Sequence, residues 1–442
     1  MTPLASHDPI TLHTGEWSFL DGPSASELSS ATGILRREWI INDDFSLSPS
    51  WLESAPLFPK IFWRSRSGGA PLLAFGQVAT GSVSDLAGLL SNSDPGIRVF
   101  GGSRFALGSG VAKWPFPSEV YFIPKAEVTR AGALTKLAIH FTRDDLETSL
   151  VSGWLNGIDV MSKQRKPGIL TRFDQPHFSQ WSEAVQLALA QISAGELDKV
   201  VLARQSTFEL AEKISPYALL ALLMSETPAC FHFCFEPTKT SGAFLGASPE
   251  QLYRRLGPSI ESEAVAGTRP RSLDPAEDTR LESQLREYSK ERLEHQFVVD
   301  ELSRAFRRLC ADFSHDEKPT VLKLSRLQHL RTQLSGRLAD GLSDEAILDE
   351  LHPTPATCGS PTTKALAFIE NNECFDRGWY AGPLGWISRE DAEFCVAIRS
   401  MHMIGNQLNV FAGAGIVAGS DAEREWMELE DKISGVLHIL AP

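Results

Sequence analysis

Short apolar segments, separated by polar turns or by helical patterns, recur along most of this chain. In its first part they predict strands at residues 60–65, 72–77 and 120–123, with Gly, Pro and Ser between them. None of these segments approaches the roughly 20 apolar residues that a membrane-spanning helix needs. The chain therefore has to bury its apolar residues in its own core, and we expect no association with a membrane.

Beyond a polar stretch at residues 162–171, helical and strand patterns are mixed. Such a mixture, with strands following one another as meanders, predicts an α+β fold. Mainly antiparallel sheets would pack together with helices on the outside. The strand patterns lie at residues 199–204, 229–235, 243–247, 252–255, 382–387, 392–403 and 407–412, and the helical patterns at 177–194, 215–225, 277–310 and 421–439.

The formal net charge of −14 argues against nucleic acid as a partner, because affinity for nucleic acid comes mainly from Lys and Arg on phosphates. It does not exclude an anionic small molecule, since a pocket can be locally positive. The six cysteines form no disulfide framework, and the N-terminus has no secretory signal pattern. We expect a cytoplasmic protein in which Cys230 and Cys234 are buried thiols rather than metal ligands.

Two predicted helices carry acids three residues apart, Glu291 with Glu294 and Glu425 with Glu428, so each pair shares a helix face. Mg²⁺ takes carboxylates and water, often through one or two carboxylates plus the substrate. Two facing helices could supply such ligands. Taken alone, however, acids at this spacing beside Arg and Lys more often form a solvated helix face.

A glycine-rich segment at residues 410–421 leads from a strand into the last helix. Its glycines resemble a dinucleotide-binding fingerprint, but that fingerprint needs a second strand with an acid about 20 residues later, and the sequence ends at Pro442. We interpret the segment as a turn whose amides bind a carboxylate. A tight turn without a ligand is the alternative.

Two further residues have acid–base potential. Lys199 begins a very apolar strand, and a lysine buried in a sheet has a lowered pKa, as a general base requires. Its alternative place is the solvent edge of the strand. Glu250 follows a Ser-Pro turn, where a carboxyl can act as a general acid, although glutamates at turns are common.

The order of these segments is more specific than any one of them. Lys199-Val-Val-Leu-Ala-Arg204 precedes Ala247-Ser-Pro-Glu250, Ala266-Gly-Thr-Arg269 and Lys290-Glu-Arg-Leu-Glu-His295. Next come Leu351-His-Pro-Thr-Pro-Ala356, Arg377-Gly-Trp-Tyr-Ala-Gly382, Ala397-Ile-Arg399, Gly413-Ala-Gly-Ile416 and the segment from Arg424 to Lys432. This series resembles the chorismate-utilising enzymes: isochorismate, salicylate and anthranilate synthases and aminodeoxychorismate synthase component I.

The resemblance implies a catalytic region at residues 168–442 and a strand-rich region at residues 1–167 that belongs to the same fold. It also implies a Mg²⁺ ion that bridges the protein and the C1 carboxylate of the substrate chorismate. The matching metal ligands are Glu294 and Glu428, with Glu291 and Glu425 beside them. The matching substrate-binding positions are Thr268, His329, Tyr380, Arg399, Gly413, Ala414, Gly415 and Lys432, although His329 fits a core or surface position nearly as well.

Within the family, Lys199 matches the residue that activates water in isochorismate and salicylate synthases. Ala266 stands where aminodeoxychorismate synthase has a nucleophilic lysine. We therefore predict an isochorismate synthase, an isomerase in which neutral Lys199 directs water to C2 while Glu250 protonates the hydroxyl that leaves C4. A salicylate synthase, which also eliminates pyruvate, is the alternative, and a non-catalytic binding protein is a third. We expect a monomer without an amidotransferase subunit.

Overall fold

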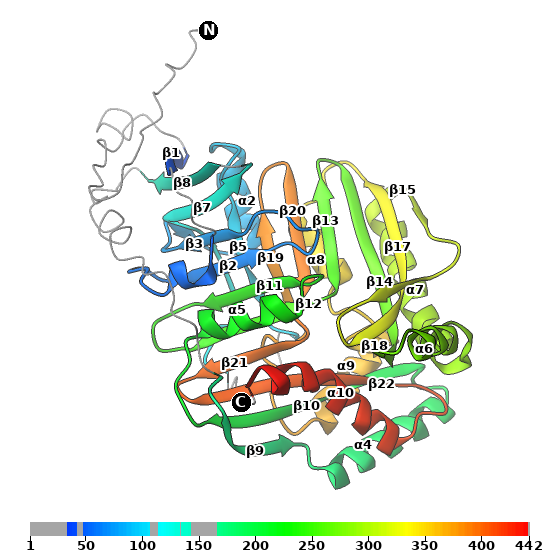
Figure 1. The fold of residues 1–442 in the computed structure, drawn as a ribbon. Helices are drawn as coiled ribbons and strands as arrows, with labels where there is room; N and C mark the ends of the chain where they lie inside the picture. Colours follow the sequence, from blue (N-terminus) through cyan, green and yellow to red (C-terminus); the bar gives the residue numbers. More distant parts are fainter. Residues whose placement is uncertain (1–32, 42–46, 107–113, 133, 143–165, 441–442) are drawn as a thin grey trace.

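The computed structural model describes residues 33–41, 47–106, 114–132, 134–142 and 166–440 (Figure 1). Two large antiparallel sheets form its centre, which confirms the predicted α+β fold. The twelve-stranded sheet runs in the order β1 (Leu35–Ile41), β8 (Leu134–Phe141), β7 (Ala126–Ala131), β3 (Leu72–Phe75), β2 (Lys60–Arg64), β11 (Phe231–Glu236), β12 (Ala243–Ser248), β21 (Ser400–Ile404), β22 (Gln407–Ile416), β10 (Lys199–Leu210) and β18 (Gly359–Ser360), and β9 (Ile169–Gln175) also pairs with β10.

The ten-stranded sheet lies beside the first. Its order is β15 (Cys310–His315), β17 (Leu327–Leu338), β14 (Ser259–Pro270), β13 (Gln251–Leu256), β20 (Asp391–Val396), β19 (Pro383–Ile387), β5 (Val99–Ser103), β6 (Glu119–Ile123) and β4 (Ala79–Thr80), and β16 (Thr320–Lys323) also pairs with β17. The helices are η1 (Pro49–Leu52), α2 (Val83–Ser91), α4 (Phe178–Ser193), α5 (Pro216–Glu226), α6 (Pro275–Glu287), α7 (Ser289–Leu309), α8 (Asp344–Leu351), α9 (Thr362–Asn372) and α10 (Ala422–Leu440).

An aromatic core joins the two sheets. Alternate residues of β2 and β11, such as Trp63 and Phe233, point from the larger sheet toward Phe100 and Phe122 of the smaller one. The residues between them, such as Cys234, belong to the core beneath the helices. Strands buried on both faces read as continuous apolar runs, which is why β2 and β11 were predictable. Each fully buried Phe contributes about 1.5–3 kcal/mol.

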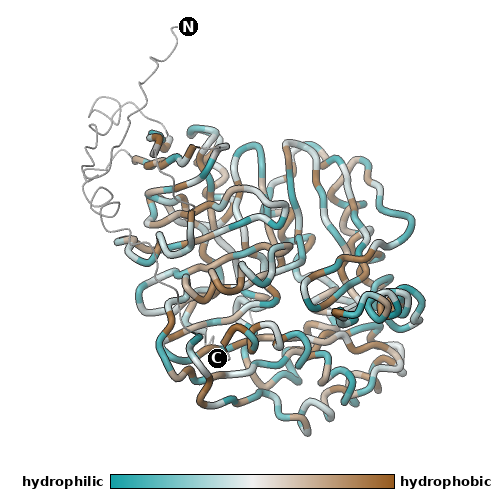
Figure 2. The backbone as a smooth tube through the Cα atoms, in the orientation of Figure 1, coloured by the Kyte–Doolittle hydropathy of each residue, from teal (hydrophilic) through white to brown (hydrophobic). Residues whose placement is uncertain are grey.

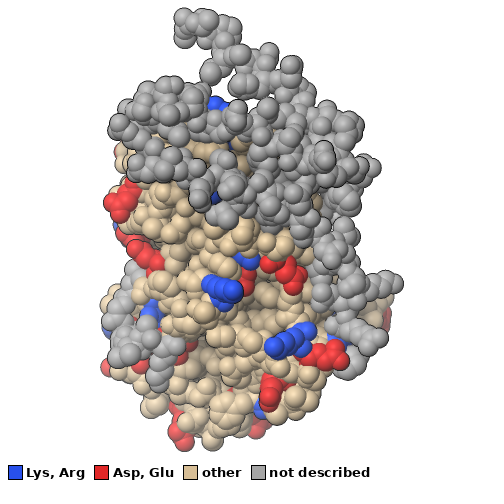
Figure 3. Space-filling view, turned by 90° about the vertical axis from the view of Figure 1, so that its left-hand side faces the viewer, with Lys and Arg blue, Asp and Glu red and all other residues tan. Residues whose placement is uncertain are grey.

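Helices cover the outer faces of the sheets. α5 and α10 lie over the larger sheet and α7 packs on β14 and β17 of the smaller one (Figure 1). α6 is almost entirely hydrophilic (Figure 2). On the face drawn in Figure 3, the visible described Lys and Arg side chains are scattered and form no basic patch. Among the helices of the described residues, none is long and apolar enough to cross a membrane.

The predicted helix at residues 277–310 is in fact two helices, α6 and α7, which meet at Tyr288. The Tyr288 backbone is extended, and its N–H donates to the Gln284 carbonyl to close α6. Neither Gly nor Pro marks the break, so the local pattern could not reveal it. A tertiary contact lies there instead, because the Arg269 guanidinium stacks on the Tyr288 ring and pairs with Glu291.

The predicted strand at residues 392–403 is also interrupted. β20 ends at Val396 and β21 begins at Ser400, and between them Arg399 has a φ of 50°. A strand requires negative φ, and a residue other than glycine adopts this conformation only where its surroundings hold it there. The break turns Arg399 out of the sheet and toward the cavity described below.

The strand β14 has no counterpart in the predictions, although it is twelve residues long. Its buried positions include the polar residues Ser262 and Glu263, and Ser262 Oγ donates to the Leu252 carbonyl inside the protein. The sequence of β14 therefore does not alternate between apolar and polar residues as a strand pattern requires. Residues 162–165 of the polar stretch at residues 162–171 lie outside the described residues. Ile169 already belongs to β9, so the predicted connection ends before it.

We propose that residues 1–167 and 168–442 fold as one unit. β2 pairs with β11 from His232 to Glu236, and strands of the first part lie in both sheets. Removal of residues 1–167 should leave β11 as an open edge and uncover the aromatic core, so residues 168–442 alone should be insoluble or unfolded. Circular dichroism and gel filtration, with the full chain as the control, test this. A soluble fragment with a cooperative unfolding transition would contradict it.

Candidate active site

A cavity with about 650 Å³ of empty space opens between the two sheets and α10, a size that suits a small-molecule ligand. β10, β14, β17, β22, α7 and α10 all contribute to its wall. Nine residues that the sequence singled out line it: Glu250, Thr268, Glu294, His329, Tyr380, Arg399, Gly413, Gly415 and Lys432. Segments that are far apart in the sequence therefore meet at one place.

Lys199 is completely buried at the start of β10, not at a solvent edge. Its Nζ lies 3.2 Å from Glu294 Oε1, without the geometry of a hydrogen bond, and it has no hydrogen-bond partner among the described residues. Lys199 does not itself line the cavity, whereas Glu294 does. A buried lysine nitrogen with one ion-pair partner and no hydrogen bond has capacity for a further polar partner.

Gly415 leaves the space that this ion pair occupies. A Cβ atom at Gly415 would lie 2.2 Å from Glu294 Oε1 and 3.1 Å from Lys199 Cε. At Gly413, a Cβ atom would lie 2.9 Å from the hydroxyl of Tyr380. Both glycines therefore give room to side chains of the site.

The prediction of a turn at these glycines is wrong, because Gly413, Ala414 and Gly415 lie within β22, which pairs with β10. Val201, opposite Gly415, donates its N–H away from β22, to Cys358. Val201 and Gly415 are therefore a pair of the antiparallel ladder that shares no backbone hydrogen bond, and the same holds for Ala203 and Gly413. The amides of Gly413 and Gly415 consequently face the edge of β22 that is opposite to β10. Ala414 bonds with β10 instead, and its side chain belongs to the core.

Glu250 is buried where a short turn joins β12 to β13. Its N–H donates to Ser248 Oγ at 3.2 Å, and its carbonyl accepts from Val396. Burial, and after it the charge of Glu263, raises the pKa of Glu250 to about 8, although nearby cations act in the opposite direction. A carboxyl of this kind is protonated near neutral pH and can donate a proton.

Cations gather at one end of the cavity. Arg399 forms no ion pair with another side chain of the described residues, and its Nη2 lies 3.4 Å from His329 Nε2. Burial, with the charges of Arg399 and Lys432, lowers the pKa of His329 to about 3, so this histidine is neutral. His329 Nδ1 is 3.2 Å from the Gly267 carbonyl, to which it donates, and this leaves Nε2 as the acceptor toward Arg399.

Lys432 and Tyr380 bring α10 and the segment before β19 to the same wall. Lys432 Nζ donates to the Gly413 carbonyl at 2.6 Å and pairs with Glu428 at 2.7 Å. Tyr380 stacks on Phe411 with 5.3 Å between ring centroids, and burial raises the pKa of Tyr380 to about 12, so its hydroxyl remains a donor.

The acidic faces of α7 and α10 are not simply solvated. Each of the four glutamates lies beside a cation: Glu291 by Arg269 at 2.5 Å, Glu294 by Lys199, Glu425 by Lys290 and Glu428 by Lys432. Burial and the charge of Glu428 raise the pKa of Glu425, which places these carboxylates close together. Glu291 Oε2 is buried without a hydrogen-bond partner in the described residues.

This donor set suits Mg²⁺, which prefers carboxylate oxygens and needs only one or two of them when substrate and water complete its coordination. A cation would give Glu291 Oε2 a partner and would reduce the repulsion between Glu425 and Glu428. Within the described residues, no three such side chains converge on one point. The residues therefore fit a shared site completed by substrate and water, rather than a closed all-protein cage.

Arg377 and Glu373 form a buried pair beside β10; one of the ordered motifs begins with Arg377, but no role for either residue followed from the sequence. Arg377 donates to Glu373 and to the Val201 carbonyl, and Glu373 accepts the N–H of Ala203 at 2.8 Å. These contacts satisfy backbone groups on the side of β10 away from β22. They hold in place the strand that begins with Lys199. Arg377 itself stands three residues before Tyr380 in the chain.

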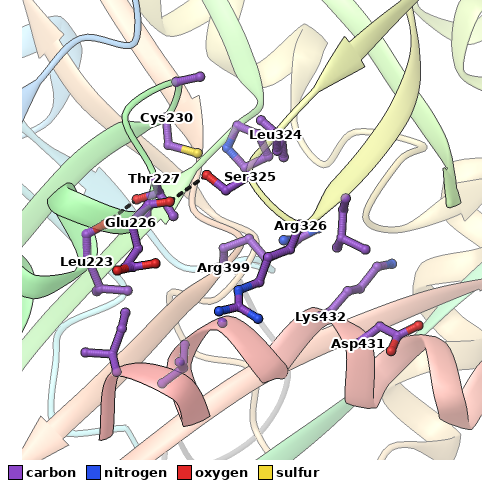
Figure 4. Close-up of a pocket in the computed structure, with 17 residues that line it drawn as sticks. Leu223, Glu226, Thr227, Cys230, Leu324, Ser325, Arg326, Arg399, Asp431 and Lys432 are labelled. Carbon is purple, nitrogen blue, oxygen red and sulfur yellow. Dashed lines mark hydrogen bonds between the residues drawn. The ribbon is translucent and has the colours of Figure 1, made fainter. Parts of the chain in front are cut away.

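A second cavity adjoins the first and shares Pro249, Arg399 and Lys432 with it (Figure 4). It lies between the end of α5, the β16–β17 turn and α10. Ser325 Oγ, in that turn, donates to the Glu226 carbonyl at 2.6 Å. Arg399 thus borders both cavities, and the main one is the cavity that contains Glu250 and Glu294.

Comparison with known proteins agrees with this geometry. Residues 59–441 match the family model described as chorismate binding enzyme. The chain belongs to this family. This chorismate binding enzyme is 32% identical over 401 residues to isochorismate synthase MenF of Escherichia coli, covering 88% of this chain and 90% of that protein. It is 32% identical over 393 residues to MenF of Haemophilus influenzae, covering 89% of each.

Solved structures resemble it as well. The structure of MenF, the menaquinone-specific isochorismate synthase from Escherichia coli, has a TM-score of 0.82 at 29% identity and covers 94% of this chain and 97% of its own. Anthranilate synthase component I from Streptococcus pneumoniae shares the fold, with a TM-score of 0.72 at 19% identity. The family resemblance predicted from the ordered motifs is confirmed.

Gly415→Ala should displace the Glu294 carboxylate, because its Cβ atom would overlap Oε1. We expect chorismate binding, measured by titration calorimetry with Mg²⁺ present, to weaken at least about tenfold, since small misplacements in a site are costly. Gly88→Ala is the matched control, because a Cβ atom at Gly88, in α2, meets nothing within 4 Å. Unchanged chorismate affinity in Gly415→Ala would contradict the proposed crowding.

Proposed function

We propose that this chorismate binding enzyme is an isochorismate synthase, a hydroxymutase of the isomerase class that converts chorismate to isochorismate. Water adds at C2 of the ring, the double bonds shift, and the C4 hydroxyl leaves. The observation that carries the proposal is that one cavity is lined both by buried, protonated Glu250 and by Glu294, the ion-pair partner of completely buried Lys199. Similarity to isochorismate synthases over 88% of the chain supports it.

The reaction needs a base for water and an acid for the departing hydroxyl. Lys199 is the proposed base in its neutral form, because its Nζ atom makes no hydrogen bond among the described residues and its ion-pair partner, Glu294, lines the cavity. Glu250 is the proposed acid, because its pKa of about 8 keeps it protonated at neutral pH. Lys199 lies on β10, whereas Glu250 lies in the turn before β13. Because they come from different elements, they can act at separate ring atoms.

Chorismate carries two carboxylates, and the cavity offers two groups of donors. We assign the pyruvyl carboxylate to Arg399 and Tyr380, aided by the outward-facing amides of Gly413 and Gly415. Neutral His329 orients Arg399 by accepting from its guanidinium. Thr268 also lines the adjoining space between the acidic helices, and Lys432 pairs with Glu428 of α10, so we place the ring carboxylate on this side of the cavity.

We assign Mg²⁺ to Glu294 and Glu428, with Glu291 and Glu425 as direct or water-mediated partners. When bound, Mg²⁺ would offset the charge of the ring carboxylate and fix its position. The basic partners of these glutamates, Arg269, Lys290 and Lys432, prearrange the carboxylates and limit their repulsion.

Water is the nucleophile that the residues favour. Position 266, on β14 at the cavity wall, is a buried alanine and cannot attack the ring. We propose that the enzyme acts as a monomer without an amidotransferase subunit. A cytoplasmic location is proposed with it, and the six cysteines support this because all are free thiols.

Incubation of the enzyme with chorismate and Mg²⁺ should yield isochorismate, which chromatography detects. Lys199→Ala and Glu250→Gln should each lower kcat by about 100-fold or more, because each removes an acid–base group. Lys213→Ala, at an exposed position, is the control and should retain activity. Absence of chorismate consumption, or anthranilate formation with ammonium, would overturn the function, and salicylate fluorescence would indicate a salicylate synthase instead.

Glu428→Gln should weaken Mg²⁺ binding at least about tenfold, because an amide is a poorer ligand for a hard cation than a carboxylate. Titration calorimetry of Mg²⁺ into the enzyme without chorismate measures this independently of turnover. Glu423→Gln is the matched control, since Glu423 is an exposed acid on the same helix. Equal Mg²⁺ affinity in both variants would remove Glu428 from the metal site.

A further inference from the structure

The loop between β2 and β3 reaches from the larger sheet to the smaller one beside Glu250. Arg66, in this loop, pairs with Glu263 of β14 through two hydrogen bonds, at 2.5 Å and 2.9 Å. Glu263 is buried, and the Arg66 side chain is 17% exposed. The Arg66 guanidinium also stacks on the ring of Phe231.

This pair bonds to the peptide groups on both sides of Glu250. Arg66 Nη1 donates to the Pro249 carbonyl at 2.5 Å, and the N–H of Gln251 donates to Glu263 Oε1 at 3.0 Å. The residues immediately before and after the proposed acid are therefore tied to the two members of one buried ion pair. A change in that pair would move the Glu250 carboxyl.

The same pair also sets much of the charge around Glu250. Glu263 raises the pKa of Glu250, second only to burial, and Arg66 from the β2–β3 loop lowers it. Lys199 of β10 and Lys432 of α10 also lower it. Two further titratable groups interact with Glu250 from the other side, Tyr380 before β19 and Cys395 of β20.

We propose that Arg66 and Glu263 are positioning residues for Glu250, by which a loop of the N-terminal strands fixes the place and protonation of the acid that serves the reaction. This rests on the proposed function and adds a role for the N-terminal part. The pair touches Glu250 only through its neighbours and through charge, so neither residue is itself catalytic.

A purely structural cross-link is the competing explanation, and the same loop provides the control. Ser65 Oγ and Trp63 Nε1 donate to the buried Glu393 of β20, at 2.7 Å and 3.1 Å. This second contact joins the same two sheets without bonding to the peptides beside Glu250. Glu393→Gln therefore weakens a cross-link between the sheets while both peptide contacts of the Arg66–Glu263 pair remain.

The experiment compares pH profiles of kcat/KM for isochorismate formation in Glu263→Gln, Arg66→Gln and Glu393→Gln. A general acid must be protonated, so activity falls as pH rises through its pKa. Glu263→Gln should move this alkaline limb to lower pH and Arg66→Gln to higher pH, each by about one unit. Glu393→Gln should leave the limb in place, whatever it does to thermal stability.

Infrared difference spectra provide a readout that does not need turnover. The protonated-carboxyl band that is absent in Glu250→Gln belongs to Glu250, and its titration should shift in the same opposite directions. If wild type makes isochorismate but neither variant moves the limb or the band, the positioning role is wrong and the function stands. If wild type makes no isochorismate, the function fails, and the infrared titration still decides the role of the pair. If Glu263→Gln does not fold, Arg66→Gln alone decides, because an unmoved band there overturns the proposal.

Discussion

β10 and β22 pair antiparallel with Val201 opposite Gly415 and Ala203 opposite Gly413, and the site depends on this register. Lys199 enters the core from the first residue of β10, and the missing side chain of Gly415 leaves room for its contact with Glu294. A slip of one residue would turn every side chain of β22 to the opposite face and replace this glycine by a side chain. The arrangement of the proposed base, the proposed metal ligand and the amides thus follows from one strand pairing.

Around that pairing, buried charges occur in matched sets. An unpaired charge in a protein interior is costly, and each of the four glutamates of α7 and α10 has a cation beside it. Arg399 is different, because no carboxylate of the described residues pairs with it. The proposed substrate carboxylate would supply an anionic partner for it. A cavity with such a guanidinium is how an acidic chain could accept the dianion of the proposed reaction.

The sequence alone led to nine residues of the cavity wall, because residues such as Glu250 and Glu294 stand in short motifs whose order is specific. It could not place Gly413 and Gly415 within β22, since glycines after a strand resemble a turn until the opposing side chains are known. Arg66 carried no signal either. It lies in a Ser- and Gly-containing loop, and its importance arises only from contact with Glu263, 197 residues later in the chain.

The protonation of Glu250 shows which physical effect dominates at this site. Three cations, Lys199, Arg66 and Lys432, favour its ionised form, whereas burial and Glu263 oppose it. The pKa nevertheless rises to about 8, so burial outweighs the cations. The proposed acid thus keeps its proton because water is excluded at the turn between β12 and β13. A mutation that opened this turn to solvent should lower the pKa of Glu250 and remove the proposed proton donor, even if every charged residue of the site remained in place.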